Sequence, residues 1–203
     1  MSRRNGVVPP DTEAAQAHFL DAAEACFERY GVGKTTMEDI AKMAGVSRPT
    51  VYRHFSDRES LILAVIMRRA RLLIDKAQAF IRRRETFEDQ LVEGLMFLVR
   101  TGRKDPFVRL LVNPQTLDTA QHMLTSEAIV DLTQEMWQPI LADAVERGEL
   151  NPALDFRAIA HWLSHVELIL VGRFDLATDD TEVREMLRTF LAPAFAPRAL
   201  LAS

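Results

Sequence analysis

Cysteine is nearly absent from this sequence, and the single residue, Cys26, excludes an internal disulfide. Cys26 lies between Ala22 and Tyr30 on the apolar side of a predicted helix. A redox-sensing thiol would need solvent exposure and positive charge close by. We therefore expect Cys26 to be a small core residue.

Long apolar runs are also missing. The best candidate, residues 168–171, is bounded by Glu167 and Arg173, whereas a membrane-spanning helix needs roughly 20 apolar residues. The first six residues, MSRRNG, lead into two prolines instead of the apolar stretch of a secretory signal. We expect a cytoplasmic protein without a membrane partner.

Residue patterns typical of enzymes and metal proteins do not occur either. We find no Ser/His/Asp order, no Gly-rich phosphate loop and no convincing metal cluster. His161 and His165 are four residues apart on one helical face, but no cysteine or clear third ligand lies near them. We expect no enzyme activity, no metal and no cofactor, and a helical enzyme is the weaker alternative.

Excess positive charge is absent from the chain as a whole, whose formal net charge is −4. Any attraction to nucleic acid must therefore be local. Residues 29–58 hold six basic side chains against three acidic ones, a net charge of +3. The basic residues are Arg29, Lys34, Lys42, Arg48, Arg53 and Arg58, and the acidic ones are Glu38, Asp39 and Asp57.

Helical periodicity dominates what is present, and 48% apolar residues suffice for a core. No segment alternates as a surface strand does, so we predict an all-α fold. The predicted helices cover residues 11–30, 37–44, 48–55, 57–84, 86–103, 106–113, 126–148, 155–175 and 181–192. We expect an N-terminal three-helix helix-turn-helix domain over 1–56 and a C-terminal helical ligand-binding and dimerisation domain over 57–203, with the helix at about 57–84 as connector.

Local signals place the ends of these helices. Gly31 is positioned as a left-handed cap of the first helix. Thr36 and Ser47 are predicted N-caps of the second and third helices, which Gly45 separates by a tight turn. Ser56, with Glu59 three residues later, predicts a capping box for the fourth helix.

Residues 35–55 form the most informative stretch, because two short helices joined by such a turn can place the second one in a major groove. Apolar positions pack toward the first helix and leave Arg48, Thr50, Arg53 and His54 toward solvent. Either arginine can read guanine bidentately. Arg58 opposes the positive end of the fourth helix, which suggests an external anion as its partner.

Four segments of this stretch resemble the TetR family of bacterial regulators over about residues 14–65. They are TTMEDIA (35–41), AGVS (44–47), TVYRHF (50–55) and SDRESL (56–61), with departures at Pro49 and Arg58. The structural alternative is a helical hairpin with a fortuitously basic surface. The resemblance implies DNA contact by Thr36, Arg48, Thr50, Tyr52, Arg53, His54 and Arg58, and we add Ser47 as a further DNA-binding candidate.

The C-terminal segment 155–175 carries apolar residues on more than one side, so it needs more than one partner. Segment 181–192 adds apolar residues at helical spacing. We expect them to pair with their copies in a four-helix bundle of a homodimer, as the resemblance also implies. A purely intramolecular core is the alternative. The predicted interface residues are Phe156, Ile159, Leu163, Val166, Leu170, Val183, Met186, Leu187 and Phe190.

The resemblance also implies an effector cavity among the intervening helices. Methionine and aromatic side chains suit an apolar or aromatic molecule, although a solid core would use the same residues. The predicted lining comprises Met96, Phe97, Phe107, Leu111, Met123, Met136, Trp137, Trp162 and His165.

Together these features predict a homodimeric transcriptional repressor that binds a palindromic double-stranded DNA operator and is released by a small-molecule effector. Two recognition helices about 34 Å apart would match successive major-groove faces. Control by a partner protein, or action as an activator, is the alternative.

Overall fold

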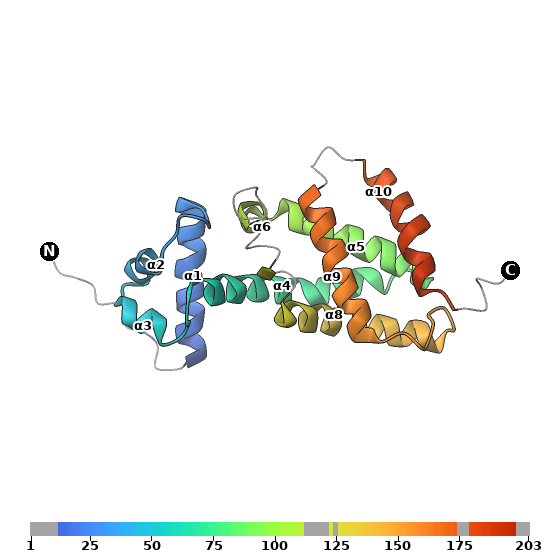
Figure 1. Ribbon diagram of the computed structural model, residues 1–203, viewed down its shortest axis with the longest axis horizontal. Coiled ribbons are helices and arrows are strands. Elements are labelled where there is room, and N and C mark those ends of the chain that lie inside the picture. The colour runs from blue at the N-terminus through green and yellow to red at the C-terminus, as the bar shows by residue number, and fades with distance from the viewer. Residues whose placement is uncertain (1–11, 112–121, 124–125, 174–178, 198–203) are drawn as a thin grey trace. The chain divides into compact units, whose positions relative to one another are not determined.

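The computed structural model describes residues 12–111, 122–123, 126–173 and 179–197, which contain helices and no strand (Figure 1). This confirms the all-α prediction. None of the helices in these ranges is long and apolar enough to cross a membrane. The elements are α1 (Thr12–Tyr30), α2 (Met37–Ala44), α3 (Arg48–Tyr52), α4 (Arg58–Ile81), α5 (Phe87–Lys104), α6 (Pro106–Leu111), α8 (Glu127–Glu146), α9 (Phe156–Arg173), α10 (Asp180–Met186), the π-helix η1 (Leu187–Leu191) and the 3-10 helix η2 (Ala192–Phe195).

These residues form two compact units. The first contains residues 12–69 with 106–111 and 122–123, and the second contains residues 70–105, 126–173 and 179–197. The uninterrupted helix α4 contributes its first half to one unit and its second half to the other. The functional boundary at residue 56 stays a prediction.

The ends of α1 and α2 form as their local signals predict. Gly31 and Gly45 have φ angles of 82° and 71°, in the left-handed region that favours glycine. Thr36 Oγ1 accepts a 3.2 Å hydrogen bond from the backbone N–H of Asp39, whose carboxylate accepts one of 3.0 Å from Thr36 N–H. This reciprocal capping box fixes where α2 begins.

The start of α4 differs from the prediction of a Ser56–Glu59 capping box. The helix begins at Arg58, so the capping residue is Asp57 and its partner is Ser60. Ser60 N–H donates to Asp57 Oδ1 at 2.7 Å, and Asp57 N–H donates to Ser60 Oγ at 3.3 Å. The backbone hydrogen bond from Ser60 lowers the pKa of Asp57, and a carboxylate suits the positive helix end better than a hydroxyl.

The first unit is organised around α1, which packs against α2 and α6. Phe19, Cys26 and Phe27 of α1 are fully buried, as are Ile40 of α2 and Val51 of α3. Burial raises the pKa of the Cys26 thiol, so the thiol stays protonated and unreactive. The prediction of Cys26 as a core residue is confirmed.

The second unit is organised around α5, which contacts α8, α9 and α10 (Figure 1). Its core includes Trp137 of α8 and Leu163 of α9, both fully buried. Arg103 of α5 is also buried, and its Nη2 donates a 2.7 Å hydrogen bond to the carbonyl oxygen of Leu170. This contact joins the C-terminal halves of α5 and α9.

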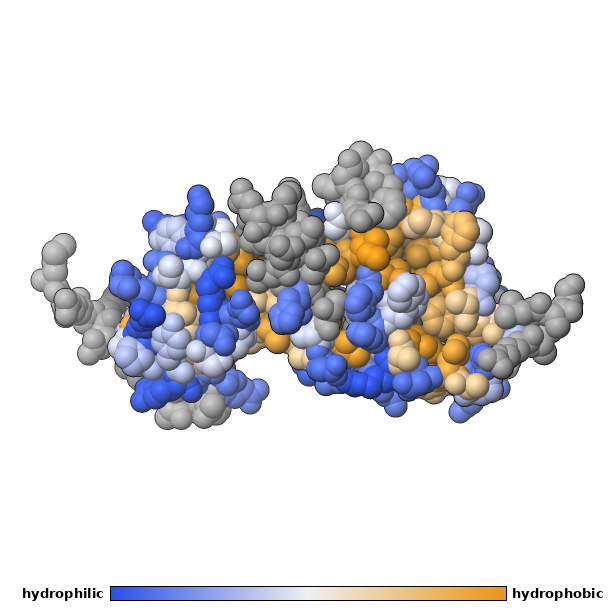
Figure 2. Space-filling view, in the orientation of Figure 1, coloured by the Kyte–Doolittle hydropathy of each residue, from blue (hydrophilic) through white to orange (hydrophobic). Residues whose placement is uncertain are grey.

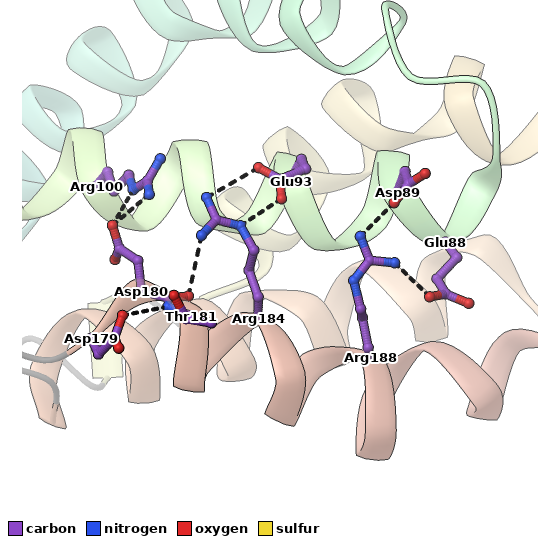
Figure 3. Close-up of polar contacts among 9 residues, drawn as sticks. All are labelled: Glu88, Asp89, Glu93, Arg100, Asp179, Asp180, Thr181, Arg184 and Arg188. Atoms are coloured by element: carbon purple, nitrogen blue, oxygen red, sulfur yellow. Dashed lines mark hydrogen bonds and ion pairs between the residues drawn. The ribbon is translucent and has the colours of Figure 1, made fainter.

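A ladder of ion pairs fastens α10 and η1 to α5 (Figure 3). Arg100 pairs with Asp180 at 2.5 Å, and Arg184 pairs with Glu93 at 2.6 Å. Farther along, Arg188 pairs with Glu88 at 2.6 Å and with Asp89 at 2.5 Å. A network of partly buried pairs fixes geometry more effectively than isolated surface pairs do. The ladder sets which face of α10 and η1 turns away from α5.

Candidate nucleic-acid interface

Helix α3 presents most of the predicted DNA-contacting residues to solvent. Ser47, Arg48, Tyr52 and Arg53 are exposed, while Thr50 and His54 are half-buried. Val51 is fully buried and anchors the opposite side of the helix. The turn at Gly45 and this anchor leave one side of a short helix free for a groove.

Contacts between side chains arrange the exposed groups on α3. Arg48 Nη2 donates a 3.2 Å hydrogen bond to the Tyr52 hydroxyl, and its guanidinium carbon lies 5.2 Å from the centre of the Tyr52 ring. Ser47 was expected to cap the helix through its hydroxyl. Instead, Ser47 Oγ lies 2.8 Å from Thr50 Oγ1 and makes no cap hydrogen bond, although Ser47 does occupy the N-cap position.

The acidic side chains of α2 are already engaged within the unit. Glu38 pairs with Lys42 at 3.0 Å, and Asp39 accepts a 2.6 Å hydrogen bond from the Thr36 hydroxyl. Hydrogen bonds from Thr36 lower the pKa of Asp39. The exposed Thr36 hydroxyl therefore donates its proton to Asp39, and its contact with DNA stays a prediction. Arg53 is exposed and has no partner among the described residues.

Arg58 does not point outward as expected. Its Nε donates a 2.8 Å hydrogen bond to the carbonyl oxygen of Thr35, and its Nη2 donates to that of Val32. The side chain is half-buried, and burial lowers its pKa. The dipole of α4 alone suggests an external anion, but carbonyl oxygens of the α1–α2 loop accept the hydrogen bonds of this cation.

Replacing Arg58 with methionine should lower the free energy of unfolding by about 1–3 kcal/mol, because two partly buried carbonyls lose a charged donor. Thermal and urea unfolding without DNA measure this loss. Lys34→Met removes an exposed cation from the same loop and should leave stability within about 0.5 kcal/mol. Unchanged stability of the Arg58 variant, with weaker salt dependence of DNA binding, would restore the phosphate-contact interpretation.

Most of the predicted dimer residues lie inside the second unit. Leu163 and Leu170 of α9 are buried in the core cluster, and Val183 and Leu187 are held inward by the ion-pair ladder. The predicted interface residues that are buried in this core of the single chain are Ile159, Leu163, Leu170, Val183 and Leu187, and their role in a dimer stays a prediction. Phe156, Val166 and Met186 are partly buried against the same core.

A different apolar set is exposed on the same elements. Trp162 and Ile169 of α9 are 53% and 49% exposed, and Phe190 of η1 is 78% exposed. Figure 2 shows apolar surface gathered over α9 and α10. Of the predicted interface residues, Phe190 alone belongs to this exposed set, which we call the outer apolar face.

The residues predicted to line an effector cavity come together only in part. Met96, Met136 and Trp137 are buried in the second unit. Phe97, half-buried there, stacks on Phe80 with ring centres 4.7 Å apart. Phe107 and Met123 belong to the first unit, Trp162 is exposed, and the side chain of Leu111 lies outside the described residues.

The histidine pair is a local contact on α9. His165 is half-buried, its Nδ1 lies 2.7 Å from the carbonyl oxygen of His161, and the two rings meet edge to face. Among the described residues, no group of three or more potential ligands could hold a metal ion.

Sequence reasoning missed Glu167, a half-buried carboxyl on the inner side of α9. The signal in the sequence was a lone acidic residue among apolar ones.

Comparisons with known proteins agree with this geometry. Residues 19–65 match the family described as "Bacterial regulatory proteins, tetR family". The probable HTH-type transcriptional regulator ArpR of Pseudomonas putida is 26% identical over 188 residues, which cover 85% of this chain and 86% of ArpR.

Solved structures share the fold. The TetR family repressor AlkX of Dietzia sp. has a TM-score of 0.64 at 23% identity, covering 88% of this chain and 94% of its own. RolR, solved with resorcinol, has a TM-score of 0.72 at 17% identity, covering 94% of this chain and 92% of its own. The similarity therefore extends over both units.

Proposed function

The chain belongs to the TetR family of bacterial transcriptional regulators, and we propose that it is a homodimeric repressor of a palindromic operator, released by a small apolar or aromatic effector. It is a helix-turn-helix DNA-binding protein of a family of regulators rather than enzymes. The observation that carries the proposal is the exposed face of α3. We place its action in the cytoplasm.

The operator contact follows from the charges on α3. Arg48 and Arg53 face solvent, while the nearby carboxylates of Glu38, Asp39 and Asp57 are engaged in an ion pair or in helix caps. Guanidinium groups so presented suit guanine edges in the major groove and phosphates beside it. A chain with a net charge of −4 thus binds DNA through one local surface.

Dimerisation is supported by the outer apolar face. Two copies joined through Trp162, Ile169 and Phe190 would bury side chains that are largely exposed in the single chain. A symmetric pair places two recognition helices on one face of the duplex, as a palindrome requires. A single copy would contact only one half-site and bind weakly.

Effector release is supported by the course of α4 and by a neighbour of the same fold. α4 runs without interruption through both units, so a ligand that repacks its second half also acts on its first. RolR was solved with resorcinol. Allosteric coupling of this kind typically amounts to about 1–3 kcal/mol.

Replacing Arg53 with alanine should weaken operator affinity by about 1–3 kcal/mol if Arg53 reads a base. The operator is first selected from genomic DNA fragments, and affinities are then measured by titration at fixed salt. Arg83→Ala, which removes an exposed arginine of the second unit, controls for net charge. Equal operator affinities of the Arg53 variant and the original protein would remove Arg53 from base reading.

The choice between repressor and activator is tested by transcription from the selected promoter. The proposal expects transcription to rise when the gene for this regulator is deleted. Loss of transcription would instead identify an activator. Release by a purified partner protein, without any small molecule, would favour the partner-controlled alternative.

A further inference from the structure

Glu167 occupies the middle of the side of α9 that faces the core. Leu163 lies four residues before it and Leu170 three after it, and both are buried; such spacings share a helix face. Ala160 and Ser164, on the same side, are buried as well. Glu167 is half-buried and has no hydrogen-bond or ion-pair partner among the described residues. Desolvation raises its pKa to about 7.

Trp137 supplies a second polar group without a partner in the same unit. Its side chain is fully buried in α8, and its indole N–H makes no hydrogen bond. α8 and α9 pack directly against each other. The interior of the second unit therefore holds one unused donor and one carboxyl, on two neighbouring helices.

Neither group is explained by the stability of the unit. A buried donor or carboxyl that loses water without gaining a partner destabilises the folded chain, and leucine or phenylalanine would fill these positions without that loss. Such unsatisfied groups call for an explanation, and a bound molecule can supply the missing partners. Trp137 belongs to the same apolar core cluster as Met96, Val99 and Leu163, so most of that molecule must be apolar.

Glu167 and the Trp137 indole N–H together restrict the polar part of the bound molecule. A ligand carboxylate would repel ionised Glu167, and a ligand ammonium has no lone pair for the indole N–H. A hydrocarbon would leave both groups unsatisfied. A hydroxyl can donate to a carboxylate and accept from an N–H, so hydroxyl chemistry complements both sites, through one such group or two.

We propose that the effector is an apolar molecule carrying at least one hydroxyl, recognised by Glu167 as acceptor and by the Trp137 indole N–H as donor. This inference rests on the proposed function, in which the second unit binds a small molecule. It adds the chemical class of that molecule and the residues that select it.

The test compares phenols with hydrocarbons of the same shape. At about pH 8, where Glu167 is mostly ionised, the full-length protein is titrated with para-ethyl-, para-butyl- and para-octylphenol and with the corresponding alkylbenzenes, and heat of binding and thermal shift are measured. At least one phenol should bind about tenfold or more tightly than its alkylbenzene, since a charged-acceptor hydrogen bond contributes roughly that factor. Replacing the phenol hydroxyl with a carboxylate should abolish binding.

Three variants test which residues produce the preference for phenols over alkylbenzenes. Glu167→Leu should bring phenol and alkylbenzene affinities within about twofold of each other and should raise the unfolding temperature without ligand. Trp137→Phe should lose part of the preference. Glu146→Leu, a change of the same type at an exposed position of α8, should retain the preference in full.

The outcomes separate this inference from the function on which it rests. If phenols and alkylbenzenes bind equally to the original protein, hydroxyl recognition is wrong while small-molecule binding stands. If none of either series binds while the operator does, both hydroxyl recognition and the apolar-effector proposal fail. A preference that persists in Glu167→Leu removes Glu167 from recognition.

Discussion

Replacing Ile169 and Phe190 together with aspartate is expected to yield a monomer that has lost tight operator binding. Both side chains belong to the outer apolar face and are 49% and 78% exposed, so the single chain should fold normally with carboxylates there. In a symmetric dimer each change occurs twice, and four carboxylates would meet at an interface without partners. Losing the second half-site should weaken operator binding by about 100-fold or more.

Sedimentation of the variant measures its mass, and titration of the selected operator measures its affinity. Leu72→Asp is the matched control, because Leu72 of α4 is 71% exposed and lies outside the outer apolar face. The control should remain dimeric and bind with unchanged affinity. A double variant that sediments as a dimer would place the subunit contact elsewhere.

The helix-turn-helix was the part of the molecule most accessible to sequence reasoning, because its signals act over a few residues. The Thr36 capping box and the left-handed turn at Gly45 each depend on neighbours within four positions. The apolar residues that anchor α2 and α3, such as Ile40 and Val51, follow from helical spacing alone. Local hydrogen bonding and periodicity therefore determine the framework that presents Arg48.

The inward and outward faces of α9 could not be assigned in the same way. Apolar residues surround much of this helix, so periodicity alone does not distinguish Leu163, which is buried, from Trp162, which is exposed. The distinction depends on where α5 and α8 pack, and α5 is about 60 residues away in sequence. Arg58 illustrates the same limit, since its acceptors lie 23 and 26 residues earlier in the chain.

The second large effect is expected at Gly94, where an added side chain would meet the core of the second unit. A Cβ at this position would lie 2.7 Å from Cη2 of Trp137 and 2.8 Å from Cδ1 of Ile81. Ile81 and Trp137 are both fully buried, so neither side chain has much room to shift. The absence of a side chain at Gly94 is therefore a packing requirement of Trp137 and Ile81.

Gly94→Ala should destabilise the protein by about 1–3 kcal/mol through overpacking, and Gly94→Val by more. A loss of stability would be informative, because replacing glycine with alanine in a helix interior normally raises the free energy of unfolding by up to about 1 kcal/mol. Urea and thermal unfolding measure the change, and about 2–4 °C is expected per kcal/mol for a chain of this size. A stabilised alanine variant would contradict the contact.

A double-mutant cycle then identifies the opposing group. Phenylalanine has no atom equivalent to Cη2 of tryptophan, so Trp137→Phe removes the nearest contact of the added methyl group. Although Trp137→Phe alone should cost stability by leaving a cavity, adding Gly94→Ala to it should cost less than adding Gly94→Ala to the original protein. Residues in direct contact show such non-additivity of about 0.5–3 kcal/mol. Additive losses would mean that the methyl group meets resistance from Ile81 or the α5 backbone instead of the indole.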